Sequence, residues 1–229
     1  MISNKLLVKV FIVCLVLPDG IVHAQDPQRG PLGFLRMLNA VSRGNGKLEF
    51  MIDGKPVRPN GYQPGNVTGA IALKPAIYKV AFSRDGVKTA NTQLPVTANS
   101  TTILIPYAEQ IPANDKQAAH WAIKILKLKQ HEPDNKRTAT FVSVAPDPEF
   151  KIEVRQPDGQ WQPVLVKRLG IARTDIQQTR GYLPVRCMEQ ALSPISIGPS
   201  GNFVSVLYQD DQGILRSKNF QDYKYLSPD

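Results

Sequence analysis

The stretch that decides the fold is FKIEVR at residues 150–155, in which apolar and charged side chains alternate without exception. Successive side chains of a β-strand point to opposite faces of the sheet. The stretch therefore predicts a strand with Phe150, Ile152 and Val154 on a buried face and the charged residues in water. The sequence PDG at residues 157–159 follows directly and ends the strand in a turn, because glycine tolerates the backbone angles that tight turns need.

Similar short apolar runs recur along the whole chain. Nineteen Pro and sixteen Gly separate these runs, which is the spacing of an all-β sandwich or barrel. Predicted strands cover residues 33–40, 48–53, 67–73, 76–82, 87–94 and 101–105 in the first half, and 138–144, 150–155, 162–167, 181–188, 195–197, 203–208 and 214–218 in the second. We therefore predict an all-β protein made of two small β-sandwich domains.

The predicted domain boundaries follow the change in composition near the middle of the chain. The N-terminal domain covers residues 33–106, a polar linker without periodicity covers 107–120, and the C-terminal domain covers 121–226. The C-terminal domain opens with WAIKILKLK at residues 121–129, which begins as a strand. Its alternation slips by one place between Ile125 and Leu126, which fits a β-bulge, with a helix as the alternative.

The N-terminus has the three parts of a cleavable export signal. Lys5 and Lys9 precede an apolar run over residues 10–17, and small residues lead to a cleavage position after Ala24. We therefore expect residues 1–24 to be removed and the mature chain to be periplasmic or extracellular, with an uncleaved anchor as the alternative. A bilayer-spanning helix needs about 20 apolar residues, and we expect none in the mature chain.

The chain is basic, with 28 Lys+Arg against 19 Asp+Glu and a formal net charge of +9. Such an excess favours an anionic partner, such as an acidic polysaccharide, an anionic envelope surface or the acidic face of another protein. The alternative is that the charge only keeps the protein soluble. The sequence carries no nucleic-acid-binding motif, so we expect no nucleic acid among the partners.

Few residues of the chain are of the types that take part in nucleophilic catalysis or metal binding. After the export signal only His120 and His131 remain, both near the predicted linker, and Cys187 is the single cysteine. Nucleophilic catalysis needs a histidine held rigidly beside the nucleophile. Structural metal sites need four ligands at regular spacing. We therefore predict that the protein is not an enzyme and binds no metal or cofactor, and we interpret Cys187 as a buried strand residue.

A group of basic residues is the one feature with a predicted role in binding. Arginine pairs with carboxylates through two parallel hydrogen bonds, and lysine acts as a point charge. A groove lined by such residues would hold a polyuronate or another acidic chain. The alternative is a solvated surface that keeps edge strands from pairing with other chains. The candidate binding residues are Lys124, Lys127, Lys129, Lys167, Arg168, Arg173, Arg180 and Arg186.

Three stretches resemble the periplasmic accessory proteins of alginate O-acetylation, the AlgF family. They are FLRMLNA at residues 34–40, LKPAIY at residues 73–78, and NKRTATFVSV at residues 135–144, which continues to the strand at 150–155. The resemblance follows strands and turns in order over most of the mature chain. It implies a non-catalytic protein that helps to place acetyl groups on an exported acidic polysaccharide, by binding the polymer or other proteins of the acetylation complex.

The first half also resembles secreted immunoglobulin-like domains of unknown function. These domains share an opening strand like that at residues 34–40 and a later turn like DGKP at residues 53–56. This second resemblance covers residues 33–106 and implies a structural or adhesive module of the cell envelope.

Overall fold

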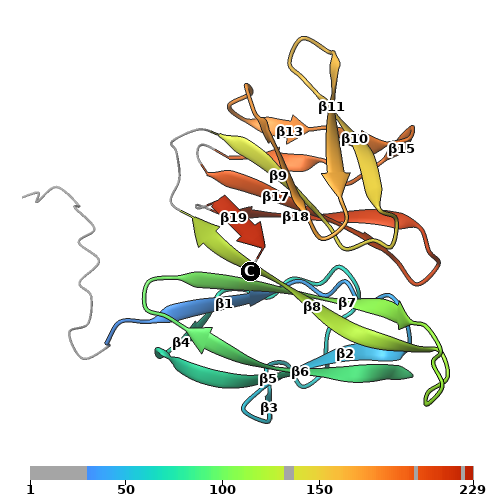
Figure 1. Ribbon diagram of the computed structural model, residues 1–229. Helices are drawn as coiled ribbons and strands as arrows, with labels where there is room; N and C mark the ends of the chain where they lie inside the picture. Colours follow the sequence, from blue (N-terminus) through green and yellow to red (C-terminus); the bar gives the residue numbers. More distant parts are fainter. Residues whose placement is uncertain (1–29, 132–136, 199–200, 223–224, 229) are drawn as a thin grey trace, which may run out of the picture. The chain divides into compact units, whose positions relative to one another are not determined.

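The computed structural model describes residues 30–131, 137–198, 201–222 and 225–228 (Figure 1). The predicted export signal at residues 1–24 lies outside the described residues. Residues 31–229 form one compact unit. Within the described residues the protein is all-β, because no helix occurs among them. None of these residues forms a helix long and apolar enough to span a membrane.

The alternating stretch FKIEVR at residues 150–155 is confirmed as a strand. β10 (Glu149–Arg155) buries Phe150, Ile152 and Val154 and leaves Lys151 and Arg155 exposed. The turn at residues 157–159 follows, with Gly159 at a φ of 86°. β11 (Trp161–Lys167) then pairs with β10 over its full length in antiparallel register.

The first part of the chain, together with the last strand, builds a nine-stranded sheet. Its strands follow the order β3-β2-β5-β6-β8-β7-β1-β4, and β19 pairs with β8 beside this path. The bounds are β1 (Gly33–Met37), β2 (Asn45–Ile52), β3 (Lys55–Pro56), β4 (Ile71–Leu73), β5 (Ala76–Asp85), β6 (Val87–Val96), β7 (Thr101–Ile111), β8 (His120–His131) and β19 (Tyr225–Pro228).

The second part builds two four-stranded sheets and one short pair, β13-β16. We call β12-β9-β17-β18 the inner sheet and β11-β10-β14-β15 the outer sheet. Besides β10 and β11, the strands are β9 (Thr138–Ser143), β12 (Ile171–Asp175), β13 (Gly181–Leu183), β14 (Val185–Cys187), β15 (Gln190–Ala191), β16 (Ile195–Ile197), β17 (Asn202–Gln209) and β18 (Leu215–Asp222).

Three apolar cores hold these sheets together. The N-terminal core lies within the nine-stranded sheet and includes Leu35, Phe50, Phe82 and Leu104. The C-terminal core lies between the inner and outer sheets. Its members include Phe141, Phe150, Ile152, Cys187 and Phe203. The middle core joins residues of β7, β8 and the chain after β1 to residues of β9 and β17. It consists of Leu38, Ala40, Ile103, Ile105, Tyr107, Leu128, Val142, Val144, Val204, Val206 and Tyr208.

The strands beside the middle core are buried on both faces. In β7, Leu104 packs in the N-terminal core, whereas Ile103 and Ile105 pack in the middle core. All six residues of β9 are buried, and so are seven of the eight residues of β17. A strand covered on both sides reads as a continuous apolar run, because neither face needs to meet water.

Burial on both faces also explains the irregular alternation at residues 121–129. The pairing of β7 with β8 continues without a shift from Thr102 opposite Lys129 to Ile111 opposite His120. The predictions of a bulge and of a helix are therefore wrong. Ile125 packs against the N-terminal core and Leu126 against the middle core, so two adjacent apolar residues serve opposite faces of one strand.

The structure also places the predicted linker and domain boundary differently. Residues 107–111 belong to β7, and His120 begins β8, so residues 107–120 form the end of a hairpin inside the nine-stranded sheet. β8 pairs with β7 in that sheet, whereas the sequence placed it at the start of the C-terminal domain. The predicted strand at 181–188 is divided at Pro184 into β13 and β14.

Candidate functional site

The eight predicted binding residues do not line one groove. Lys124, Lys127 and Lys129 lie on β8, but the side chains of a strand alternate, so Lys124 points to the opposite face from the other two. Arg173 lies on β12, and exposed Arg180 lies between β12 and β13. These residues therefore occupy several strands and faces.

Arg168 has a role in holding the two parts together. Its Nη2 lies 2.8 Å from Oε1 of Glu109 on β7, and its guanidinium lies 5.8 Å from the ring centre of Tyr107. Both side chains of the ion pair are about three-quarters covered, at 26% and 29% exposure. The Arg168 charge is thus directed to a neighbouring carboxylate of the same protein.

The open face of the outer sheet brings two of the predicted residues, Lys167 and Arg186, together with seven others. Phe150, Ile152 and Val154 of β10 face the C-terminal core, so Lys151, Glu153 and Arg155 face outward. The paired strands place further residues on that face. Lys151 lies opposite Leu165, Glu153 opposite both Pro163 and Arg186, Arg155 opposite Trp161, and Glu149 opposite Lys167. We call these nine residues the outer face.

Trp161 and Arg186 form a pair at one end of the outer face, where Arg155 lies opposite Trp161. The Arg186 guanidinium lies 4.2 Å from the centre of the Trp161 ring, within cation–π range. Its Nε donates to Oε2 of Glu153 at 2.7 Å, and its Nη1 donates to Oε2 of Glu189 at 3.1 Å. These contacts place the Arg186 guanidinium between two carboxylates and the indole ring.

The outer face carries both an apolar strip and an excess of positive charge. Trp161, Pro163 and Leu165 succeed one another along β11, and Leu165 is 53% exposed. Four cations, Lys151, Arg155, Lys167 and Arg186, stand against the two carboxylates Glu149 and Glu153. Such a surface can bind a ligand that offers apolar C–H groups together with negative charge.

Cys187 lies on the opposite side of the outer sheet and is buried in the C-terminal core. Burial raises the pKa of its thiol, and the carboxylates of Asp147 and Glu153 raise it further. The thiolate is the reactive form of cysteine, so these surroundings keep Cys187 unreactive.

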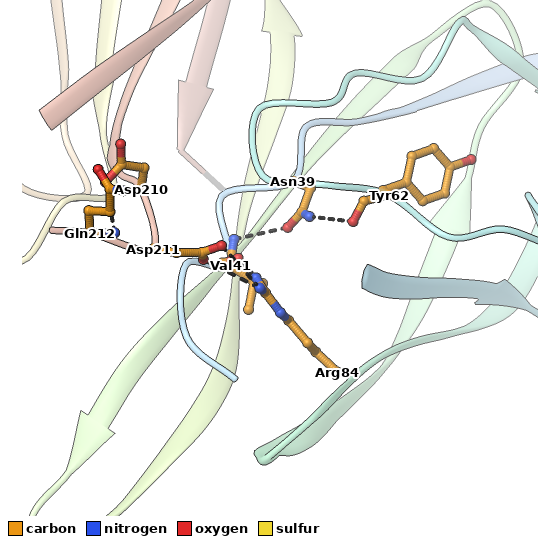
Figure 2. Close-up of polar contacts among 7 residues, drawn as sticks. All are labelled: Asn39, Val41, Tyr62, Arg84, Asp210, Asp211 and Gln212. Carbon is orange, nitrogen blue, oxygen red and sulfur yellow. Dashed lines mark hydrogen bonds and ion pairs between the residues drawn. The ribbon is translucent and has the colours of Figure 1, made fainter. Parts of the chain in front are cut away.

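A second set of polar contacts lies between β5, the chain after β1 and the loop that joins β17 to β18 (Figure 2). Buried Arg84 donates through Nη1 to the carbonyl oxygen of Val41 and through Nη2 to Oδ1 of Asp211 at 3.3 Å. Asn39 is also buried, donates to the carbonyl oxygen of Tyr62 at 3.0 Å and accepts from the amide of Val41 at 2.9 Å. Each of these partners belongs to the protein itself, so we interpret the set as structural.

Sequence reasoning missed Arg84, Asn39, Lys151, Arg155 and Trp161. The alternation at residues 150–155 places Lys151 and Arg155 on the solvent-facing side of a strand. It does not show which residues of the neighbouring strands lie beside them. Among the described residues, no group of three His, Cys, Asp or Glu is placed to hold a metal ion.

No protein-family model matches the chain, and no curated protein matches it significantly.

Proposed function

We propose that this protein is a non-catalytic accessory protein that holds an acidic, alginate-like polysaccharide outside the cytosol while the polymer is O-acetylated. The observation that carries the proposal is the outer face, where three strands place Trp161 on the same face as four cations and Arg186 stacks on its ring. A uronate chain presents an apolar ring face and one carboxylate per sugar, which complements an indole flanked by Lys and Arg.

Two further points support a binding role. The carboxylate of Glu153 already accepts a hydrogen bond from Arg186, and Cys187 is buried on the other side of the sheet. The outer face therefore offers groups that bind rather than a nucleophile ready to react. The predicted export signal and the resemblance of residues 34–40, 73–78 and 135–144 to alginate O-acetylation accessory proteins agree with a periplasmic location and with this polymer.

We also propose that the two parts are immunoglobulin-like sandwich modules that share the middle core. In each part the first strand runs parallel to a later one, β1 beside β7 and β9 beside β17. Every other neighbour of these strands within their sheets is antiparallel.

A second candidate function is the docking of another protein of the acetylation complex. Met188 is 80% exposed next to β14, and Leu165 is 53% exposed on β11. Met, Trp and Arg are enriched in protein interfaces, so the same face would suit a protein partner. A structural or adhesive module of the envelope would use the face in the same way.

The test is binding of the purified protein to immobilised polymannuronate, compared with a neutral glucan. We expect binding at about 0.01 M salt, where the Debye length is ~30 Å, and its loss at about 1 M salt, where it is ~3 Å. The double substitution Lys151→Glu and Arg155→Glu should abolish binding. Trp161→Ala should weaken it about tenfold, which corresponds to ~1.4 kcal/mol.

The matched control changes the same charge elsewhere. Lys55→Glu with Lys74→Glu alters two exposed lysines of the first part by the same four units of charge and should leave most of the binding intact. Equal losses of binding in both double variants would show that the interaction depends only on the net charge of the protein. Absence of polymer binding, with capture of an acetylation enzyme that Trp161→Ala prevents, would replace the polymer with a protein partner.

A further inference from the structure

β6 and β8 separate just after they meet. Their pairing is parallel and consists of the single position Lys88 opposite Ala122. Beyond it, β6 continues along β5 to Val96, and β8 continues along β7 to Lys129. The two strands thus form a fork that opens from this point.

A hollow of about 260 Å³ lies at the base of the fork. Its polar lining includes Lys88, Thr89, Gln117, His120 and Lys124, and its apolar lining includes Ile111, which lies opposite His120. We call this hollow the fork pocket. It does not overlap the outer face, whose residues lie on β10, β11 and β14.

The fork pocket is cationic and lacks a balancing acid. Lys88, Ala122 and Lys124 lie on one face of the sheet, because directly paired residues share a face and residues two apart on a strand do so as well. No Asp or Glu is among the described residues that line the pocket. Glu109 lies opposite Ala122 on the same face, but its carboxylate is bound by Arg168 at 2.8 Å. Lys88 and Lys124 are therefore available to bind an anionic ligand.

His120 supplies a hydrogen-bond acceptor for a hydroxyl group of the ligand. Its Nδ1 lies 3.2 Å from the carbonyl oxygen of Ala118. A carbonyl oxygen only accepts, so this contact places the proton of a neutral ring on Nδ1. Nε2 is then the acceptor, and it suits the O–H of a ligand held beside the lysines.

We propose that the fork pocket binds a single carboxylated sugar ring. Lys88 and Lys124 would hold the carboxylate, His120 would accept from a ring hydroxyl, and Ile111 would contact the C–H face. Pockets for drug-sized ligands measure ~300–1,000 Å³, so a hollow of this size suits one ring rather than a chain. The ring could be a free sugar acid or the end residue of an acidic polysaccharide. The proposal does not depend on polymer binding by the outer face.

The test is a titration of the ¹⁵N-labelled full-length protein with sodium glucuronate, with glucose and sodium acetate as probes of each half of the ligand. We expect glucuronate to shift the amide signals of Thr89, Gln117 and Ala122, and to bind at least about tenfold more tightly than glucose or acetate. Lys88→Gln and Lys124→Gln should each weaken glucuronate about tenfold, and the double variant should not bind it.

Controls separate this site from the outer face and identify the source of the ring. Trp161→Ala and the pair Lys55→Gln with Lys74→Gln should leave glucuronate binding unchanged, and a thermal melt should show that each variant is folded. If an oligouronate displaces glucuronate only through its end residue, the pocket binds the end of an acidic polysaccharide. If the oligouronate does not compete, the pocket binds the free sugar acid. Equal affinity for glucuronate, glucose and acetate would overturn the proposal, and so would unchanged binding in the double lysine variant.

Discussion

Nη2 of Arg84 lies 3.3 Å from Oδ1 of Asp211, although 127 positions separate the two residues in the chain. Arg84 ends the buried part of β5 with a side chain that is 3% exposed, and Asp211 lies in the loop after β17 with a side chain that is 56% exposed. Together with the bond from Arg84 to the carbonyl oxygen of Val41, this pair joins three segments from both parts of the chain.

Replacing Arg84 should destabilise the protein strongly. Arg84→Ala removes the donor to the carbonyl oxygen of Val41 and leaves a cavity, so we expect a loss of about 2–4 kcal/mol in the free energy of unfolding. Asp211→Asn keeps an acceptor at an exposed position and should cost about 1 kcal/mol or less. Urea unfolding of both variants measures the difference. Equal losses would show that the ion pair, rather than the buried hydrogen bond, is the important contact.

The buried hydroxyls of β9 give a second prediction. Oδ1 of Asn202 accepts hydrogen bonds from Thr138 at 3.0 Å and from Thr140 at 2.6 Å, and all three residues are buried. Asn202→Ala leaves both hydroxyls without this acceptor, so we expect a loss of about 2–3 kcal/mol. Thr138→Val removes one donor and should cost less, which chemical denaturation can resolve. A smaller loss for Asn202→Ala than for Thr138→Val would contradict this account.

Asp210 should contribute a pH-dependent part of the stability. Burial raises the pKa of its carboxyl, but hydrogen bonds from Arg216 and from the amides of Ile214 and Gln212 outweigh burial and lower the pKa below its ordinary value of 3.8. A group with a lowered pKa in the folded state stabilises the protein above the ordinary pKa and loses this effect as the pH falls through the lowered one. Asp210→Asn should therefore cost about 1 kcal/mol at pH 7, from the weakened hydrogen bonds, and little at about pH 2.

Thermal melts across this pH range provide the measurement for Asp210. The control is Asp115→Asn, which makes the same chemical change at an exposed residue in the turn between β7 and β8. A cost of Asp210→Asn that stays constant from pH 7 to pH 2 would rule out the linkage.

Cys187 should resist thiol reagents in the folded protein. It is 3% exposed, and its raised pKa keeps the thiol protonated at neutral pH. We expect the native protein to react with a disulfide reagent at least about 100-fold more slowly than the same protein in denaturant, since reaction then requires unfolding. Cys187→Ala identifies the labelled position. Rapid labelling of Cys187 under native conditions would place the thiol at the surface.

The sequence predicts local structure well where one face of a strand is wet. FKIEVR at residues 150–155 is such a case, and its strand, its buried face and its turn are all confirmed. Where both faces are buried, the same method identifies a strand but not what covers it. Residues 138–144 and 203–208 were predicted as strands, and only the folded chain shows that they share a core with Ile103 and Tyr107.

The candidate site was less predictable because its contacts are distant in sequence. Arg168 and Glu109 are 59 positions apart, and Arg186 and Glu153 are 33 apart. A charge excess on a linear chain does not reveal which cations a neighbouring carboxylate has already bound. It also does not reveal that the pairing of β10 with β11 and β14 places Arg155 and Arg186 around one indole.

The middle core has a practical consequence for anyone who wishes to divide this protein. A cut between His131 and Arg137 would give one piece with Ile103, Ile105 and Tyr107 uncovered and another with Val142, Val204 and Val206 uncovered. Large uncovered apolar patches promote aggregation. Expressed separately, the two pieces should be found in inclusion bodies, and co-expressed they should recover a soluble, nicked protein.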